Sequence, residues 1–481
     1  MKTQLIAMAA LAALSLGCDT TRRAREVQRK VAPEVAEPRL LSATGEVAVT
    51  EAPVVVKSEP RVSLVGFTLP DFVEFASTNR PDVVQAFLAV SNACLALREV
   101  RADSPFVPHI SASGGYKRST QNKGVHFGSH SDGDPWGSLD VDILIYDFGR
   151  NMALERAARE DLLSAAQSFR EKRLSVFKEV SDAYFTLLMN DALLEAAFTN
   201  HYQYAQHLER AEELLRNQEA KKLDVLRARL DLSEARHKMI AASNDVVTAE
   251  LDFLRALGLT PARSSRDDLL PVASNCLAVV HQELEESDMN MAQSLRIARI
   301  GAPRLAAGRA QVRAASAEVD YRIADLMPEL SLGTSVSFAE KVWNWSWGST
   351  LIHSLFTGYR KTIAVDEAVL ALEAAKAAYD ATEQEVARDV GVALAKRHTA
   401  HEQLAAARVS VVQARENLET ASGQLTVGDI SRIDFSDAVT AYAESLGTRV
   451  RAFYAGQMAE AELVRLTGGK PVYLHKILGI D

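Results

Sequence analysis

The sequence predicts a mainly α-helical protein that also carries a membrane β-barrel portion and is built from two copies of one structural unit. Two stretches of the chain repeat one order of elements: a short helix, a Pro, a pair of alternating strands, a Gly and a very long helical hairpin. The segment between Arg150 and Leu257 contains neither Gly nor Pro, which is typical of long uninterrupted helices. All four tryptophans lie within or beside the predicted strands.

Composition and charge exclude several classes of protein. The chain has 481 residues, of which 47% are hydrophobic and only 6% aromatic, which favours tightly packed helices over thick globular layers. A net charge of -9 without a basic cluster argues against a nucleic-acid partner. The sequence has no phosphate-binding Gly loop, HExxH, paired CxxC or nucleophile elbow, so we expect neither enzyme activity nor a cofactor. His398 and His401 share a helical face without a third ligand nearby, so no metal site is expected.

The N-terminus predicts export from the cytoplasm. Lys2 precedes an apolar run over residues 5–16, which is typical of a signal peptide (residues 1–17) and too short to span a bilayer. Residues 14–18, Leu-Ser-Leu-Gly-Cys, resemble a bacterial lipobox, and Cys18 is then the lipidated first residue of the mature chain; the alternative is an ordinary cleaved signal. Residues 18–66 contain four prolines and no helical period, and predict an extended tether behind the lipid.

The first structural repeat is expected over residues 67–260. Helical periodicity runs from about Pro70 to Ala102, with Pro81 at a helix start or kink. Alternation over residues 110–116 and 138–145 then predicts two strands joined by a polar loop. A helix from 151 to about 216, a turn at 217–221 and a returning helix that ends at Gly258 complete the unit.

The second structural repeat is expected over residues 289–470, with strands at 330–338 and 343–351. An irregular connecting segment, residues 261–288, separates the repeats, and residues 471–481 form a C-terminal tail. Cys94 and Cys276 could form one disulfide or remain two thiols, and the spacing leaves both open.

The strands are predicted to cross a membrane. No segment after the signal has 18 consecutive apolar residues, so a crossing must use strands, and strands of about 9–11 residues match a tilted crossing. Trp136, Trp343, Trp345 and Trp347 are expected at the lipid interface, where Trp is enriched. The alternative is a sheet exposed in the periplasm. Four strands cannot close a barrel, because each open edge would leave unpaired backbone in hydrocarbon, so several copies must share one barrel.

Four sequence motifs resemble a known family: Tyr-Asp-Phe-Gly-Arg at 146–150, Glu-Val-Ser-Asp-Ala-Tyr at 179–184, Asp-Val-Leu at 224–226 and Val-Gly-Asp-Ile-Ser at 427–431. Together with the repeated order of elements, they make the chain similar to outer-membrane efflux proteins of the TolC type over about residues 67–470. The resemblance implies a homotrimer whose twelve strands form one barrel in the outer membrane. A long α-helical barrel would continue it across the periplasm.

The resemblance also implies a function and partners. The expected function is that of a passive exit duct, which takes substrates from an inner-membrane pump through a periplasmic adaptor protein and releases them across the outer membrane. Outer-membrane lipid and the lipidated Cys18 would hold the duct in that membrane. The competing interpretation is a lipid-anchored coiled coil that spans the periplasm as a structural or tethering protein without a channel. The sequence does not identify the substrate.

Site residues are carried over from the same resemblance. Asp434 and Asp437 match the positions of the family's pore-constricting aspartates, and their spacing of three places them on one helical face. Asp224 occupies the equivalent place in the first repeat. The alternative for these acids is a solvated face near a helix N-terminus. Val427, Gly428 and Asp429 match the tip that receives the adaptor; the alternative is a plain Gly helix cap.

Overall fold

The computed structural model describes residues 67–117, 134–218, 221–259, 291–339, 342–353, 359–427, 430 and 432–469. The chain divides into two units, residues 1–59 and 60–481, and every described residue belongs to the second. The signal peptide, Cys18, the tether, the connecting segment, the C-terminal tail and Cys276 lie outside the described residues. Their predictions therefore stay predictions.

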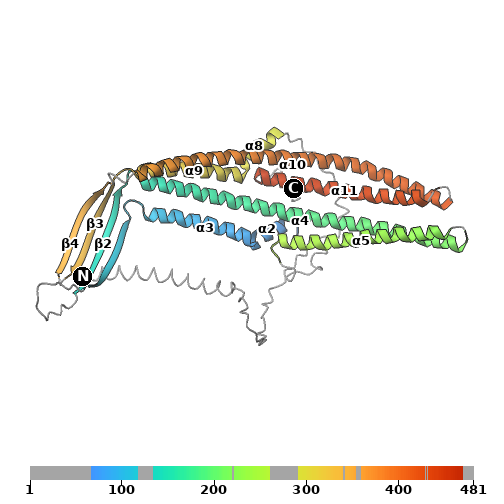
Figure 1. The fold of residues 1–481 in the computed structure, drawn as a ribbon, viewed down its shortest axis with the longest axis horizontal. Helices are drawn as coiled ribbons and strands as arrows, with labels where there is room; N and C mark the ends of the chain where they lie inside the picture. The colour runs from blue at the N-terminus through green and yellow to red at the C-terminus, as the bar shows by residue number, and fades with distance from the viewer. Residues whose placement is uncertain are drawn as a thin grey trace, which may run out of the picture. The chain divides into compact units, whose positions relative to one another are not determined.

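The described elements occur twice in the same order (Figure 1). The first series is α2 (Leu69–Asn79), α3 (Pro81–Ala102), β1 (Pro108–Lys117), β2 (Asp134–Tyr146), α4 (Arg150–Arg216) and α5 (Lys222–Ala256). The second is α8 (Met291–Gly301), α9 (Pro303–Ala324), β3 (Glu329–Ala339), β4 (Val342–Ile352), α10 (Arg360–Val427) and α11 (Arg432–Thr467). The predicted order of elements is therefore confirmed.

The long helices follow the sequence prediction closely. The prediction of one helix from 151 to about 216 is confirmed by α4, which has 67 residues, and its counterpart α10 has 68. The single helix expected from Pro70 to Ala102 is instead two helices, α2 and α3, that meet at Arg80. Pro81 and Pro303 each occupy the first turn of their helix, where a missing N–H costs nothing.

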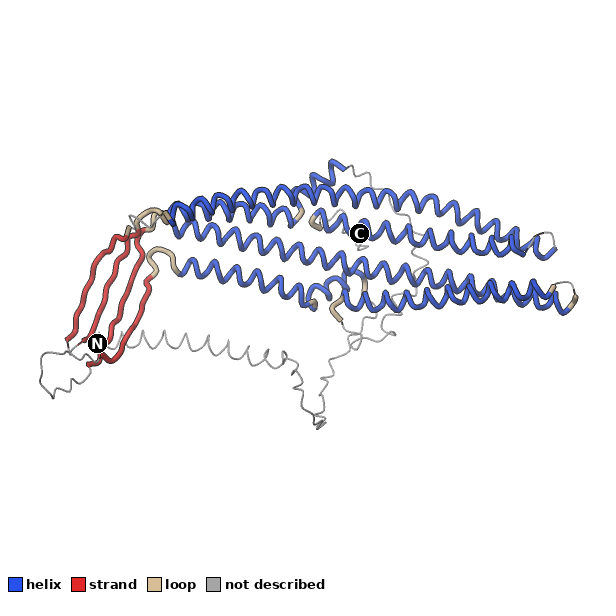
Figure 2. Tube along the Cα trace, viewed as in Figure 1, coloured by secondary structure: helices blue, strands red, loops and turns tan. Residues whose placement is uncertain are grey.

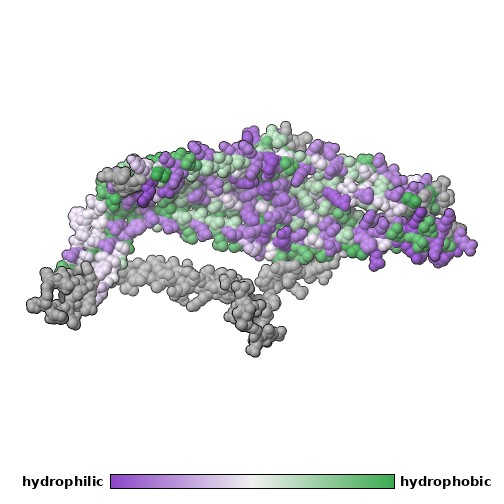
Figure 3. Space-filling model, in the orientation of Figure 1, coloured by the Kyte–Doolittle hydropathy of each residue, from purple (hydrophilic) through white to green (hydrophobic). Residues whose placement is uncertain are grey.

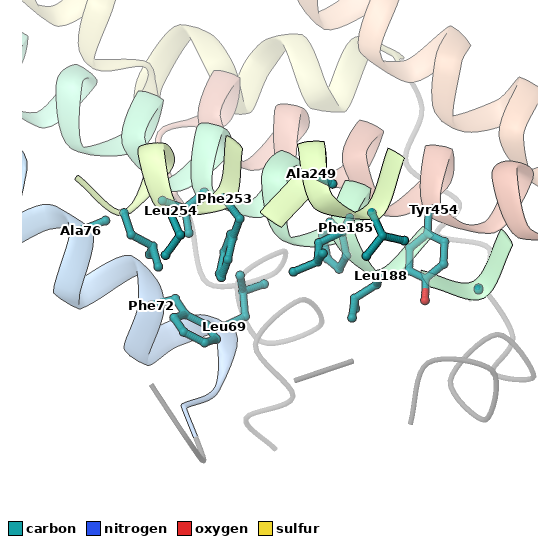
Figure 4. Packing of buried hydrophobic residues seen from close by; sticks show 14 of the residues in the cluster. Leu69, Phe72, Ala76, Phe185, Leu188, Ala249, Phe253, Leu254 and Tyr454 are labelled. Atoms are coloured by element: carbon teal, nitrogen blue, oxygen red, sulfur yellow. The ribbon is translucent and has the colours of Figure 1, made fainter. Parts of the chain in front are cut away.

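Within this unit the helices pack side by side in two series (Figure 2). Toward the hairpin turns the order is α5, α4, α11, α10; toward the sheet it is α3, α4, α9, α10. The largest core cluster lies where α2 meets α4, α5 and α11 (Figure 4). Phe72 and Phe253 are fully buried there, with ring centroids 5.1 Å apart in an edge-to-face arrangement. This core fixes the hairpins to one another far from the sheet.

Each repeat ends its hairpin on a left-handed Gly that packs against the break between its own two short helices. Gly258 has φ 77°, and a Cβ there would meet Arg80 Cγ at 3.0 Å. Gly468 has φ 81°, and a Cβ there would meet the Gly301 carbonyl oxygen at 2.0 Å. In both, the N–H after the Gly bonds the carbonyl five residues earlier, as in a Schellman motif.

We expect Gly468→Ala to destabilise the protein severely. The alanine must adopt a left-handed backbone conformation, at a cost of about 1–2 kcal/mol. Its Cβ must also displace the backbone of Gly301. The matched control is Gly423→Ala inside α10, where a Cβ meets nothing within 4 Å and helix propensity improves. Thermal unfolding followed by circular dichroism should show a large drop in Tm for the first variant and none for the second. Equal Tm values would contradict the packing described for Gly468.

A partly buried ionic cluster joins α4 to α11. Arg465 contacts Glu171 at 2.8 Å and Glu462 at 2.7 Å, and Lys178 contacts Asp182 at 2.5 Å. Burial raises the pKa of Glu171 and of Asp182, and their cationic partners offset this only in part. The folded protein therefore binds a proton at each of these two carboxyl groups more tightly than the unfolded chain does. The stability that the two protonated groups contribute is complete at pH values below the pKa values of the unfolded chain. It is lost as the pH rises through the higher pKa values of the folded protein.

The double variant Glu171→Gln with Asp182→Asn should accordingly flatten the pH dependence of stability. We expect the Tm of the variant, compared with that of the parent, to become relatively higher as pH rises from about 4 to 8, because burial of two carboxylates is removed. A Tm difference that moves in the opposite direction over this range would show that ion pairing outweighs burial in this cluster.

Candidate functional site

The strand register gathers apolar side chains on one face of the four-stranded sheet, which has the antiparallel order β1-β2-β3-β4. Directly opposed residues share a face, so the pairing assigns each paired side chain; Ile145 has no partner because the register shifts between Leu144 and Tyr146. The apolar face carries Pro108, Ile110, Ala112, Tyr116, Leu139, Val141, Ile143, Tyr146, Leu330, Leu332, Val336, Phe338, Trp343, Trp345, Trp347 and Leu351, together with Gly, Ser and Thr. No described element packs over this face as a core would require.

The opposite face is polar. It carries His109, Ser111, Ser113, Trp136, Ser138, Asp140, Asp142, Glu329, Ser331, Ser335, Ser337, Asn344, Ser346 and Thr350, with Leu144, Val342 and Ile352 toward the strand ends. Serine hydroxyls pair across strands, at 2.8 Å between Ser113 and Ser138 and between Ser335 and Ser346. Such a surface can line water, which the apolar face cannot.

Three of the four tryptophans stand together on the apolar face. Trp343, Trp345 and Trp347 on β4 are 72%, 75% and 78% exposed, and Trp345 Nε1 donates to Thr334 Oγ1 at 3.0 Å. Trp136 lies on the opposite face of the sheet from these three. It pairs with Gly115 on the polar face, because it lies one residue out of phase with the apolar positions of β2, and its indole covers that Gly.

The expected constriction residues lie at the end of the unit opposite the sheet (Figure 1). Asp434 is in the first turn of α11, Asp437 follows one turn later, and both are exposed. The buried face of the same turns, Phe435, Ala438 and Val439, packs against Tyr204 of α4 and Ala421 of α10. The two carboxylates are therefore held on a well-packed helix and point away from its core.

Asp224 has a local role that the sequence interpretation did not assign. It is half-buried at the start of α5, and its Oδ2 accepts the backbone N–H of Lys221 at 3.1 Å, which caps this helix. It belongs to the other hairpin and is not on the face shared by Asp434 and Asp437. Val427 is the last residue of α10, whereas Gly428 and Asp429 lie outside the described residues. Among the described residues no cluster of potential metal ligands is found.

Comparison with known proteins identifies the family. The family model described as "Outer membrane efflux protein" matches residues 73–259 and 295–469, one stretch for each repeat. The chain belongs to this family. Two curated relatives are similar to it: OprJ, an outer membrane protein of Pseudomonas aeruginosa, is 25% identical over 440 residues, 84% of this chain and 85% of OprJ. Protein CyaE of Bordetella pertussis is 26% identical over 285 residues, 59% of this chain and 57% of CyaE.

Two solved structures share the fold. CusC superposes with a TM-score of 0.72 at 19% identity, over 91% of this chain and all of CusC. VceC of Vibrio cholerae superposes with a TM-score of 0.70 at 17% identity, over 83% of this chain and 96% of VceC. The predicted resemblance to outer-membrane efflux proteins and the predicted mainly helical fold with four antiparallel strands are thereby confirmed, whereas the trimer and the membrane barrel stay predictions.

One residue that the sequence interpretation missed is Tyr204. It is one of three tyrosines in a helix of 67 residues, so neither periodicity nor a motif distinguishes it. Only the three-dimensional structure shows that its hydroxyl reaches α11 beside the two aspartates.

Proposed function

We propose that this efflux protein is the outer-membrane exit duct of a tripartite system, a passive channel made by three copies of the chain. The observation that carries the proposal is that a single copy of the chain has edges without a neighbour both in its sheet and in its helical part. In the sheet, β1 and β4 are the two end strands. In the helical part, α3 and α5 lie at one side of the packing series and α10 at the other.

The helices at these edges expose hydrophobic side chains (Figure 3). On α3 they are Val84, Phe87, Leu88 and Leu95; on α5 they are Leu223, Leu226, Leu230 and Ile240; on α10 they are Ile363, Leu370, Val409 and Val412. By length and composition, α3 is the one described helix that could cross a membrane. We assign its apolar surface to a neighbouring copy instead, because α3 packs along α4, which is too polar to enter lipid.

The internal repeat favours the same arrangement. In the second repeat the short helix α9 packs between its own long helix α10 and α4 of the other repeat. In the first repeat α3 packs on its own long helix α4 and has no such second neighbour in the packing series. If α3 meets α10 of the next copy as α9 meets α4, the pattern repeats around a closed ring.

Ring closure also removes the strand edges. Because β1 lies on the α3 side and β4 on the α10 side, the same head-to-tail contact pairs them, and three copies give twelve antiparallel strands. The apolar face then meets lipid and the polar face lines the lumen. The helical barrel continues the lumen to the tips, where Asp434 and Asp437 would form two carboxylate rings.

The direction and energy of transport must come from partners. No nucleotide-binding motif occurs in the sequence, so we assign the energy to an inner-membrane pump, joined through a periplasmic adaptor at the tips around Val427. Lipidation at Cys18 would anchor each copy to the outer membrane.

Reconstitution in planar lipid bilayers tests this proposal. We expect discrete conductance steps from a detergent-purified trimer that dissociates on heating, and loss of both properties in the heated sample. A monomer that gives no current would support the alternative, a lipid-anchored tethering protein without a channel.

A further inference from the structure

Tyr204 joins the two helical hairpins close to the tip. Its side chain is 6% exposed and packs with Phe435, Ala438 and Val439 of α11. Its hydroxyl oxygen lies 3.2 Å from the Ser436 carbonyl oxygen, 3.1 Å from Ser436 Oγ and 3.0 Å from Thr440 Oγ1. A phenol can donate one hydrogen bond and accept others, so it can donate to the carbonyl and accept from the two hydroxyls at once.

These contacts lie on the same two turns of α11 that carry the exposed aspartates. Phe435 and Ser436 stand between Asp434 and Asp437 in sequence, so α4 holds this part of the helix from the side away from the carboxylates. One turn further along α4, the ring of His207 stacks on Phe435, with centroids 5.2 Å apart and 28° between the planes. Any rotation or slide of α11 that moves the aspartates must therefore break the Tyr204 hydrogen bonds.

We propose that Tyr204 is a positioning residue of the constriction. Its hydroxyl fixes the rotation of α11 against α4, and so holds Asp434 and Asp437 toward the pore axis and stabilises the narrow state. This inference rests on the proposed function, in which those aspartates line the pore. Tyr204 belongs to the first repeat, and it affects the constriction only by holding α11 of the second repeat in place.

Tyr204→Phe tests the inference, since it keeps the ring in the apolar cluster and removes the hydroxyl. In planar bilayers we expect the ratio of open to closed dwell times to rise about five-fold, the factor that corresponds to one hydrogen bond of about 1 kcal/mol. Block by a trivalent cation should weaken in parallel. The matched control is Tyr454→Phe, which removes a phenol hydroxyl from the fully buried Tyr454 of α11, far from the aspartates; it should leave the current unchanged.

Variants at the other end of the hydrogen bond separate positioning from general packing. Thr440→Val removes one of the three contacts and should change the dwell times in the same direction as Tyr204→Phe but by less, and Thr440→Ser, which keeps the hydroxyl, should behave as the parent. If Tyr204 acts through the carboxylates, its effect on cation block should disappear in a background with Asp434→Ala and Asp437→Ala.

Each outcome points to one conclusion. A parent protein that gives no current overturns the proposed function and this inference with it. A conducting parent in which the aspartates control block, while Tyr204→Phe behaves as Tyr454→Phe, overturns the inference alone. An equal effect of Tyr204→Phe with and without the two aspartates also overturns it, because the tyrosine would then act independently of them.

Discussion

Replacing Val141 with Arg is expected to abolish assembly in the membrane. Val141 lies near the middle of β2 on the apolar face, directly opposite Ile110 and Thr334. A cationic side chain near the bilayer midplane costs about 2–4 kcal/mol in a barrel, and each of three chains would carry one. We expect no heat-sensitive trimer in the membrane fraction, measured by gel mobility with and without heating.

Ser335→Arg is the matched control for this change. It introduces the same side chain at a similar height on the polar face, directly opposite Asp140, where water and a carboxylate can solvate it. The trimer should form normally, with a lower single-channel conductance because the Arg narrows the lumen and adds positive charge. Equal tolerance of both substitutions would contradict the assignment of the apolar face to lipid.

Replacing Asp434 and Asp437 together with Ala should raise the conductance and weaken block by multivalent cations. Both side chains are exposed on the first turns of α11, so their loss leaves the packed face of the helix unchanged. A carboxylate and a unit cation 4 Å apart attract by about 4 kcal/mol near a protein surface, so loss of two rings should raise the inhibitory concentration of a trivalent cation at least about ten-fold.

A charge-preserving control shows whether the loss of cation block comes from the lost negative charge. Asp434→Glu with Asp437→Glu keeps both carboxylates and should retain cation block close to that of the parent. Unchanged current in the Ala variant, with the trimer intact, would remove these residues from the constriction and leave them as a solvated helix face.

The order of elements could be predicted from the sequence because its signals are local. The segment free of Gly and Pro between Arg150 and Leu257 forms α4 and α5. The alternating residues of the strands fall on the faces that a period of two requires, except where the register shifts between Leu144 and Tyr146 at the end of β2. The break at Arg80 does not follow from the sequence, because a Pro at position 81 fits either a kink or a new helix. In the structure Arg80 has an extended backbone, with φ -71° and ψ 129°, and this separates α2 from α3.

The candidate site was harder to predict because it depends on contacts between distant segments. The hydroxyl of Tyr204 meets a partner 236 residues away at Thr440. The capping role of Asp224 requires the exact turn at Lys221, and the separation of Trp136 from the other tryptophans requires the strand register. Hydrophobic periodicity predicts none of these three features, because it shows on which face of a helix or strand a residue lies but not which residues that face contacts.

Tryptophan fluorescence of the Trp136→Phe variant in lipid vesicles tests the central claim most directly. The only indoles left are those of Trp343, Trp345 and Trp347, all on the apolar face of β4. If this face contacts lipid, acyl chains carrying bromine should quench most of the emission, and aqueous iodide should quench little. Strong quenching by iodide with none by brominated lipid would place the face in water and contradict the account.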